Sequence, residues 1–198
     1  FRDVSAWYHI VAVWDTTNAT ASDRIKLYVN GTQITNFSAS SNASLNENST
    51  INNTQVHTIG RVDTVYYYDG YVSEINFIDG QALTPSSFGE TDTLSGIWIP
   101  KAYTGTYGTN GFYLKFANSA SLGTDSSGNG NNFTVNNLTS VDQSTDTPSN
   151  NFATWNPLYT YGNQSFTEGN LQIATGTSGG STGTIAVNTG KWYWECKV

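Results

Sequence analysis

The stretch that most constrains the fold is "RIKLYVNGTQIT", which covers residues 24–35. Apolar residues occupy every second position from Ile25 to Val29, so they share one face of an extended strand. Asn30-Gly31 follows directly and supplies the two positive-φ positions that a type I′ turn requires. The segment therefore predicts two antiparallel strands joined by a tight turn.

Other short strand signals recur along the chain, and no long segment has a convincing helical period. Residues 7–14, "WYHIVAVW", carry little charge on either face, which predicts a strand packed between layers. Residues 71–77 and 112–116 alternate with period two, and residues 84–90, "TPSSFGE", suit at most one helical turn. Short strands without helices between them predict an all-β fold, an antiparallel β-sandwich or jelly roll.

The chain divides by texture into three parts. Residues 1–95 carry the strand signals, and residues 96–150 form a Gly- and aromatic-rich segment followed by a polar linker. Residues 151–198 hold new strand signals, which predict the start of a second β-sandwich. Both ends of the sequence lie in strand-like runs, so we expect a fragment of a longer protein.

The last run, "KWYWECKV", contains the only cysteine of the chain, so no intrachain disulfide can form. Cys196 alternates with Trp192, Trp194 and Val198, and this pattern predicts a buried thiol in a strand.

Composition and charge exclude some functions. Only 12% of the residues are charged, the net charge is −7, and the eight basic residues are scattered. Nucleic-acid binding needs clustered Lys and Arg, and an anionic membrane surface needs the same, so we expect neither partner. No apolar run has the length of a membrane-spanning helix, so we expect no membrane insertion.

Three stretches in order carry a family resemblance. "AWYHIVAVWDTT" with "RIKLYVNGTQIT" resembles the central strands of laminin G-like, concanavalin-type jelly rolls. "YYYDGYVSEINFIDGQALTPSSF" is similar to their closing strand. The resemblance covers about residues 1–90 and implies the C-terminal part of such a domain.

Two further resemblances concern the rest of the chain. "NTGKWYWECKV" is similar to the entry strand of a SPRY domain. The stretch with "GFYLKF" and "DSSGNGNNFT" is similar to segments that join such modules in virion proteins of marine bacteriophages. This resemblance implies a virion-surface or tail-fibre protein outside the cell.

Catalytic signals are weak. The acidic residues near an aromatic cluster are Asp63, Asp69 and Glu74, and they do not form the facing pair that a glycosidase needs. Asp69 precedes a glycine and suits a turn, and the family resemblance implies that Glu74 is a sheet residue. His9 and His57 lie in strand signals without a nearby nucleophile motif, so we expect no enzyme.

The segment "TDSSGNGNN" is the one candidate metal site. Asp125, Ser127, Asn129 and Asn131 stand two apart around glycines, and calcium takes carboxylate, amide and carbonyl oxygens. The alternative, which we favour, is a plain Asx-Gly turn, because no terminal glutamate completes the set. No other cofactor is expected.

Aromatic residues in polar, glycine-rich surroundings are the candidate ligand site. A pyranose has an apolar face and a hydroxyl rim, so it stacks on flat rings beside amide and hydroxyl partners. The alternative is that these rings pack the modules together, and we favour packing. The candidates are Tyr66, Tyr67, Tyr68, Trp98, Tyr103 and Tyr107.

The sequence thus predicts a non-enzymatic structural and adhesion protein at the surface of a virion, outside the cell. Its partners would be a host-surface glycan or receptor, together with other copies of itself or other virion proteins. The alternatives are a purely architectural fibre or decoration subunit, a secreted lectin-like carbohydrate-binding domain and a polysaccharide-degrading enzyme.

Overall fold

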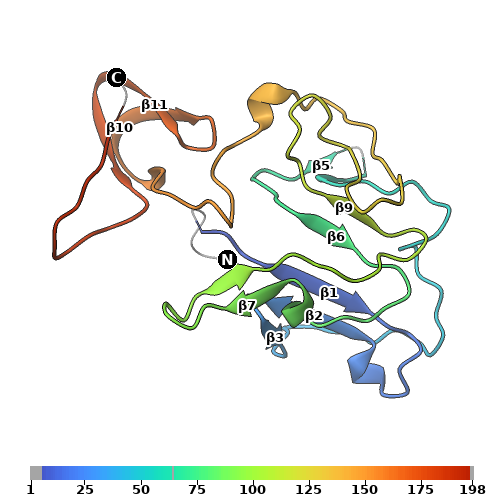
Figure 1. Ribbon diagram of the computed structural model, residues 1–198. Helices are drawn as coiled ribbons and strands as arrows, with labels where there is room; N and C mark the ends of the chain where they lie inside the picture. The colour runs from blue at the N-terminus through green and yellow to red at the C-terminus, as the bar shows by residue number, and fades with distance from the viewer. Residues whose placement is uncertain (1–5, 64, 197–198) are drawn as a thin grey trace. The chain divides into compact units, whose positions relative to one another are not determined.

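The computed structural model describes residues 6–63 and 65–196, and within them every extended sheet is antiparallel (Figure 1). The helical elements in these residues are short 3-10 turns, η1 (Ala21–Asp23), η2 (Pro85–Ser87) and η3 (Ser140–Asp142). The predicted all-β antiparallel fold class is confirmed. The chain forms two compact units, one of Trp7–Ser140 and one containing the described residues from Val141 onward.

A three-stranded sheet in the order β1-β2-β3 organises the first unit. Its strands are β1 (Ile10–Trp14), β2 (Ile25–Val29) and β3 (Thr32–Ile34). The predicted hairpin is confirmed, because Asn30 and Gly31 have φ values of 47° and 79° between β2 and β3. The expected strand at residues 7–14 begins at Ile10 rather than at Trp7.

Three two-stranded sheets complete this unit, and two of them join the 96–140 segment to earlier residues. β6 (Ile75–Phe77) pairs with β9 (Phe112–Leu114), and Figure 1 shows the two strands side by side. β7 (Gly89–Thr91) pairs with β8 (Trp98–Pro100). β4 (Arg61–Val62) pairs with β5 (Tyr66–Tyr67).

These pairings differ from the expected boundaries, in which residues 96–150 lay between two modules. Residues 96–140 lie in the same compact unit as residues 7–95, because β6 and β7 take their pairing partners from them. The expected strand at residues 112–116 and the helical turn at residues 84–90 are confirmed as β9 and η2.

The buried core of the first unit is small. Leu114 is the largest fully buried side chain among the described residues, with Leu122 and Ala43 also buried. Phe77 and Phe112 stack across β6 and β9, with ring centroids 5.3 Å apart. Arg24 is buried too, and its guanidinium donates hydrogen bonds to three backbone carbonyl oxygens, those of Asn18, Ala19 and Ala43.

The second unit is built on one long hairpin. β10 (Trp155–Thr167) pairs with β11 (Gln172–Gly183), and the glycine-rich residues 176–183 are part of β11. No strand is assigned to residues 184–196, so the strand predicted around Cys196 is not formed in the described residues.

The predicted burial of Cys196 is wrong, because this thiol is exposed. Trp192 and Trp194 are exposed as well, at 64% and 81%. A period-two pattern buries one face only where a neighbouring strand or layer covers it, and no described strand pairs with this segment. Val198, the last residue of that pattern, lies outside the described residues.

Candidate functional site

Three tyrosines of the first unit form a continuous aromatic row, which we call the tyrosine row: Tyr103, Tyr107 and Tyr113. Tyr103 meets Tyr107 edge to face with ring centroids 5.1 Å apart, and Tyr107 stacks on Tyr113 at 6.3 Å. Phe88 extends the row, 5.1 Å from Tyr103. All four side chains are half-buried, so each ring is partly covered by its neighbours and partly open to solvent.

Polar groups of β6 and the turn before it line the row. The Tyr107 hydroxyl donates a hydrogen bond of 2.8 Å to Asn76 Oδ1, and the Tyr103 hydroxyl donates one of 3.0 Å to the Thr106 carbonyl oxygen. Burial, together with the nearby charge of Glu74, raises the pKa of Tyr113 to about 12. Burial also raises the pKa of Tyr107, so both hydroxyls keep their protons at neutral pH.

Asp125 anchors the strand that carries Tyr113. Its Oδ1 accepts hydrogen bonds of 2.8 Å from the backbone N–H groups of Tyr113 and Ser127. Its Oδ2 accepts bonds from the Ser127 hydroxyl at 2.8 Å and the Asn131 N–H at 2.9 Å. Burial would raise the pKa of this carboxyl, but these hydrogen bonds outweigh it and lower the pKa.

Two asparagine side chains brace the loop that follows Tyr107. Asn129 Nδ2 donates to the carbonyl oxygens of Gly108 and Gly111 at 2.6 and 2.8 Å. Asn131 Nδ2 donates to those of Thr109 and Gly111 at 3.0 and 2.9 Å. Asn129 and Asn131, which the sequence predicts as metal ligands, therefore lie close to Tyr107. They hold the backbone of residues 108–111 in place beside the tyrosine row.

The arrangement around Asp125 does not fit a calcium ion. Calcium takes six to eight oxygen ligands, but the Asp125 carboxylate faces four hydrogen-bond donors, and both asparagines turn their NH₂ groups to carbonyls. Within the described residues, no three acidic, histidine or cysteine side chains cluster for a metal. The geometry favours the Asx-Gly turn, and calcium remains only a prediction from sequence.

The other predicted aromatics lie elsewhere. Tyr66, Tyr67 and Tyr68 lie on the β4-β5 hairpin and its exit, and they are 70%, 69% and 59% exposed. The Tyr68 N–H donates to the Gly60 carbonyl oxygen at 2.8 Å, which closes the hairpin beneath these rings. This exposed tyrosine triplet is a surface separate from the row.

Trp98 is half-buried against the three-stranded sheet. Its Nε1 donates a hydrogen bond of 2.9 Å to His9 Nδ1, and the two rings stack with centroids 5.8 Å apart. A Cβ atom at Gly31 or Gly89 would lie 2.5 Å from the Trp98 side chain, so both glycines provide the space for this ring. These contacts favour the alternative in which Trp98 packs parts of the protein together rather than contacting a glycan.

Three residues of the site were not predicted from the sequence: Tyr113, Phe88 and Asn76. Tyr113 alternates with Phe112 and Leu114, and that signal predicts a strand without showing its neighbours. The only available signal was its spacing of six residues from Tyr107, which becomes informative once β9 is known to pair with β6.

The acidic residues do not form a catalytic pair in the described structure. Asp63 and Asp69 are exposed, and Glu74 interacts with Tyr113. The Glu74 backbone has a φ of 53°, in the left-handed region, and its carbonyl oxygen accepts a bond of 3.2 Å from Asn76 Nδ2. Glu74 is thus one of the polar residues that line the tyrosine row.

The antiparallel strands and their aromatic surface define a β-scaffold that is consistent with a jelly-roll sandwich. Residues 2–87 match the Laminin_G_3 family model, described as the concanavalin A-like lectin/glucanases superfamily. No curated protein and no solved structure matches the chain. The match supports the laminin G-like resemblance and is compatible with carbohydrate binding or adhesion, and its description covers glucanases as well as lectins. The SPRY and bacteriophage resemblances remain predictions.

Among the described residues, no helix has both the length and the apolar character needed to cross a membrane.

Proposed function

We propose that this protein is a non-enzymatic glycan-binding protein that uses the tyrosine row as its contact surface. One observation carries the proposal: Tyr103, Tyr107 and Tyr113 lie in contact with one another beside Asn76 and Glu74. Stacked or edge-on rings offer apolar faces, while the carboxylate and amide offer acceptors and donors. This is the combination that a sugar ring requires.

Bracing of the row supports binding rather than mere packing. A loop that is rigid before binding loses little conformational entropy when a ligand arrives. The hydrogen bonds from Asn129 and Asn131 hold residues 108–111 in this way, next to Tyr107. The hydroxyls of Tyr103 and Tyr107 already donate their protons to Thr106 and Asn76, so they would accept hydrogen bonds from sugar hydroxyls.

The setting that we propose is the surface of a virion, outside the cell, in a tail-fibre-type protein that attaches to a host glycan or receptor. The resemblance of the 111–134 stretch to joining segments of phage virion proteins supports this setting. The net charge of −7 favours uncharged partners over nucleic acid and anionic membranes.

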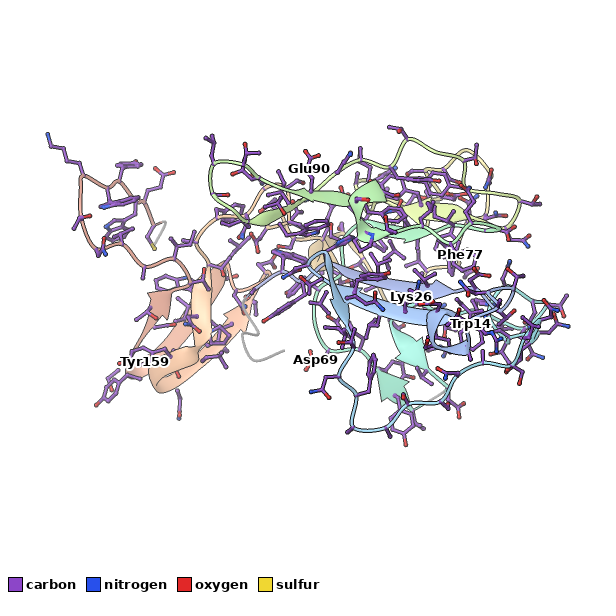
Figure 2. All side chains as sticks on the ribbon, turned by 90° about the horizontal axis from the view of Figure 1, so that it is seen from below. Trp14, Lys26, Asp69, Phe77, Glu90 and Tyr159 are labelled. Carbon is purple, nitrogen blue, oxygen red and sulfur yellow. The ribbon has the colours of Figure 1, made fainter. Side chains whose placement is uncertain are left out.

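The test is binding of the full chain to a glycan array, with Tyr103→Ala and Tyr107→Ala as variants. We expect each variant to lose roughly two- to tenfold in affinity, because stacking of one aromatic ring contributes on the order of 0.5–1.5 kcal/mol. Tyr159→Ala is the matched control, since Tyr159 is 72% exposed on β10 and projects from that hairpin in Figure 2. Equal glycan binding by all three variants would contradict the proposal.

A second candidate function, an architectural fibre or decoration subunit, is favoured by the exposed tyrosine triplet. Exposed contiguous apolar side chains mark association surfaces, and Val62 and Val65 beside the triplet are 71% and 65% exposed. Sedimentation velocity separates the two functions. Assembly that is lost in a Tyr66→Ser/Tyr67→Ser variant would indicate self-association through this surface.

Absence of catalysis is tested directly. Incubation of the chain with host-type polysaccharides, followed by chromatography of the products, should release no fragments. Fragment release that requires Glu74 would instead establish a glucanase-type activity.

A further inference from the structure

A shallow groove lies on the three-stranded sheet, apart from the tyrosine row and the exposed triplet. Its volume is about 190 Å³, and the residues that line it come from β1, β2, the connection between them and the loop at residues 82–84. None of the tyrosine-row residues lines it. The groove is therefore a distinct feature of the first unit.

The strand register explains why these residues meet. Val13 lies opposite Lys26 in the β1-β2 ladder, so side chains two residues away on either strand share their face. Tyr28 lies two residues after Lys26, and Asp15 lies two residues after Val13, just beyond β1. Figure 2 labels Lys26 on this sheet. Ala82 and Leu83 provide a small apolar wall on the other side of the groove.

The polar groups in the groove are fixed in place. Asp15 Oδ1 accepts hydrogen bonds from the Thr17 N–H at 3.1 Å and the Thr17 hydroxyl at 2.6 Å. These bonds orient the carboxylate, and Oδ2 makes no hydrogen bond to the described part of the chain. Lys26 Nζ lies 3.2 Å from Asp23 Oδ1, so the opposite charges of these two side chains neutralise each other.

The chemistry of the lining selects a class of ligand. An anion would meet two carboxylates, Asp15 and Asp23, against one ammonium that is already paired. A sugar hydroxyl, in contrast, can donate to Asp15 Oδ2 and accept from Lys26 or the Tyr28 hydroxyl at the same time. Val13 and Leu83 supply apolar contact for the C–H face of a ring.

We propose that this groove is a second binding site, specific for one neutral hexose unit. Pockets for drug-sized ligands measure about 300–1,000 Å³. A groove of about 190 Å³ is therefore suited to a single sugar ring rather than to a longer chain. The site stands independently of the tyrosine row, so either proposal can fail alone.

The experiment is saturation-transfer NMR and calorimetry on the full chain. The probes are the methyl glycosides of glucose, galactose and mannose, with glucosamine as the cationic probe and glucuronate as the anionic probe. We expect at least one neutral glycoside to bind more tightly than glucuronate, because the two carboxylates of the groove repel an anionic probe. Asp15→Asn should weaken it at least about tenfold, because the bond to a charged acceptor becomes a neutral one.

A second variant tests the groove without removing a contact that stabilises the fold. Ala82 is exposed, so Ala82→Trp fills the groove without removing a buried contact, and it should abolish binding of the neutral glycoside. Asp69→Asn is the matched control for charge, because Asp69 is an exposed carboxylate outside the groove. Melting curves confirm that each variant is folded.

The outcomes separate the two sites. Neutral-glycoside binding that is lost in both groove variants but retained in Asp69→Asn and Tyr107→Ala supports the groove. Binding that only Tyr107→Ala reduces would overturn the groove and leave the tyrosine row standing. Binding of the charged probes alone, or of no probe, would also overturn it.

Discussion

Trp98 Nε1 donates a hydrogen bond of 2.9 Å to His9 Nδ1, which joins two residues that are 89 positions apart in the sequence. Because Nδ1 is the acceptor, the neutral imidazole must carry its proton on Nε2. The contact connects β8 to the residue before β1, and thereby attaches the β7-β8 pair to the three-stranded sheet.

This contact predicts a dependence of stability on pH. Burial lowers the pKa of His9 below its ordinary value of 6.5. The unfolded chain therefore takes up a proton first as the pH falls, and stability is lost between about pH 6.5 and the lower folded pKa. Thermal melts monitored by tryptophan fluorescence from pH 8 to 5 should show the decline. His9→Gln should flatten it, and an unchanged slope in that variant would disprove the role of His9.

Gly31 provides a prediction about steric fit. Gly31→Ala should lower the free energy of unfolding of the first unit by roughly 2–4 kcal/mol. A residue with a Cβ is strained at this positive φ, and the new Cβ would lie 2.5 Å from the Trp98 ring. Gly80 has the same φ of 79° but no atom within 4 Å of the corresponding Cβ. Gly80→Ala should thus cost only about 1–2 kcal/mol in urea unfolding. Equal losses in the two variants would show that Trp98 does not occupy that space.

Asp125 should matter to stability more than an ordinary turn residue. Asp125→Ala removes a carboxylate that accepts four hydrogen bonds, and we expect a loss of roughly 2–4 kcal/mol. Because the folded pKa is lowered, this stabilisation is present above pH 3.8 and is lost as the pH falls through the folded value. Urea unfolding at pH 7 and acid titration measure both effects.

Metal removal tests the same turn from another direction. Since the donors around Asp125 leave no geometry for calcium, the melting temperature should be equal in EDTA and in millimolar calcium. A rise in melting temperature with calcium, lost in Asn129→Ala, would contradict this and restore the calcium site predicted from sequence.

Tyr113 should titrate unusually late. Its pKa is raised to about 12 by burial and by Glu74, so ultraviolet titration should show one phenol ionising near that pH. The raised pKa contributes stability that is fully present below pH 10 and is lost as the pH rises toward 12. Glu74→Gln should move the late transition to lower pH. A late transition that persists in Tyr113→Phe would belong to another residue.

Some features of this protein follow from local sequence. Asn30-Gly31 between alternating apolar residues specifies a hairpin, because the turn's φ values and the side-chain period are both local properties. The alternation at residues 112–114 specifies a strand in the same way, and Pro85 specifies a helical turn. The candidate rings Tyr103 and Tyr107 were also identified in this way, from their glycine-rich surroundings.

Other features depended on pairing between distant segments, which no local pattern encodes. β9 could have paired with any free strand edge, and only its position beside β6 brings Tyr113 to Tyr107 and Asn76. Likewise, the polar run at Asp125–Asn131 became a brace because its asparagines reach residues about twenty positions earlier. The period of a strand determines which side chains share a face, whereas its neighbours determine what that face contacts, and those neighbours are chosen by the free energy of the whole fold.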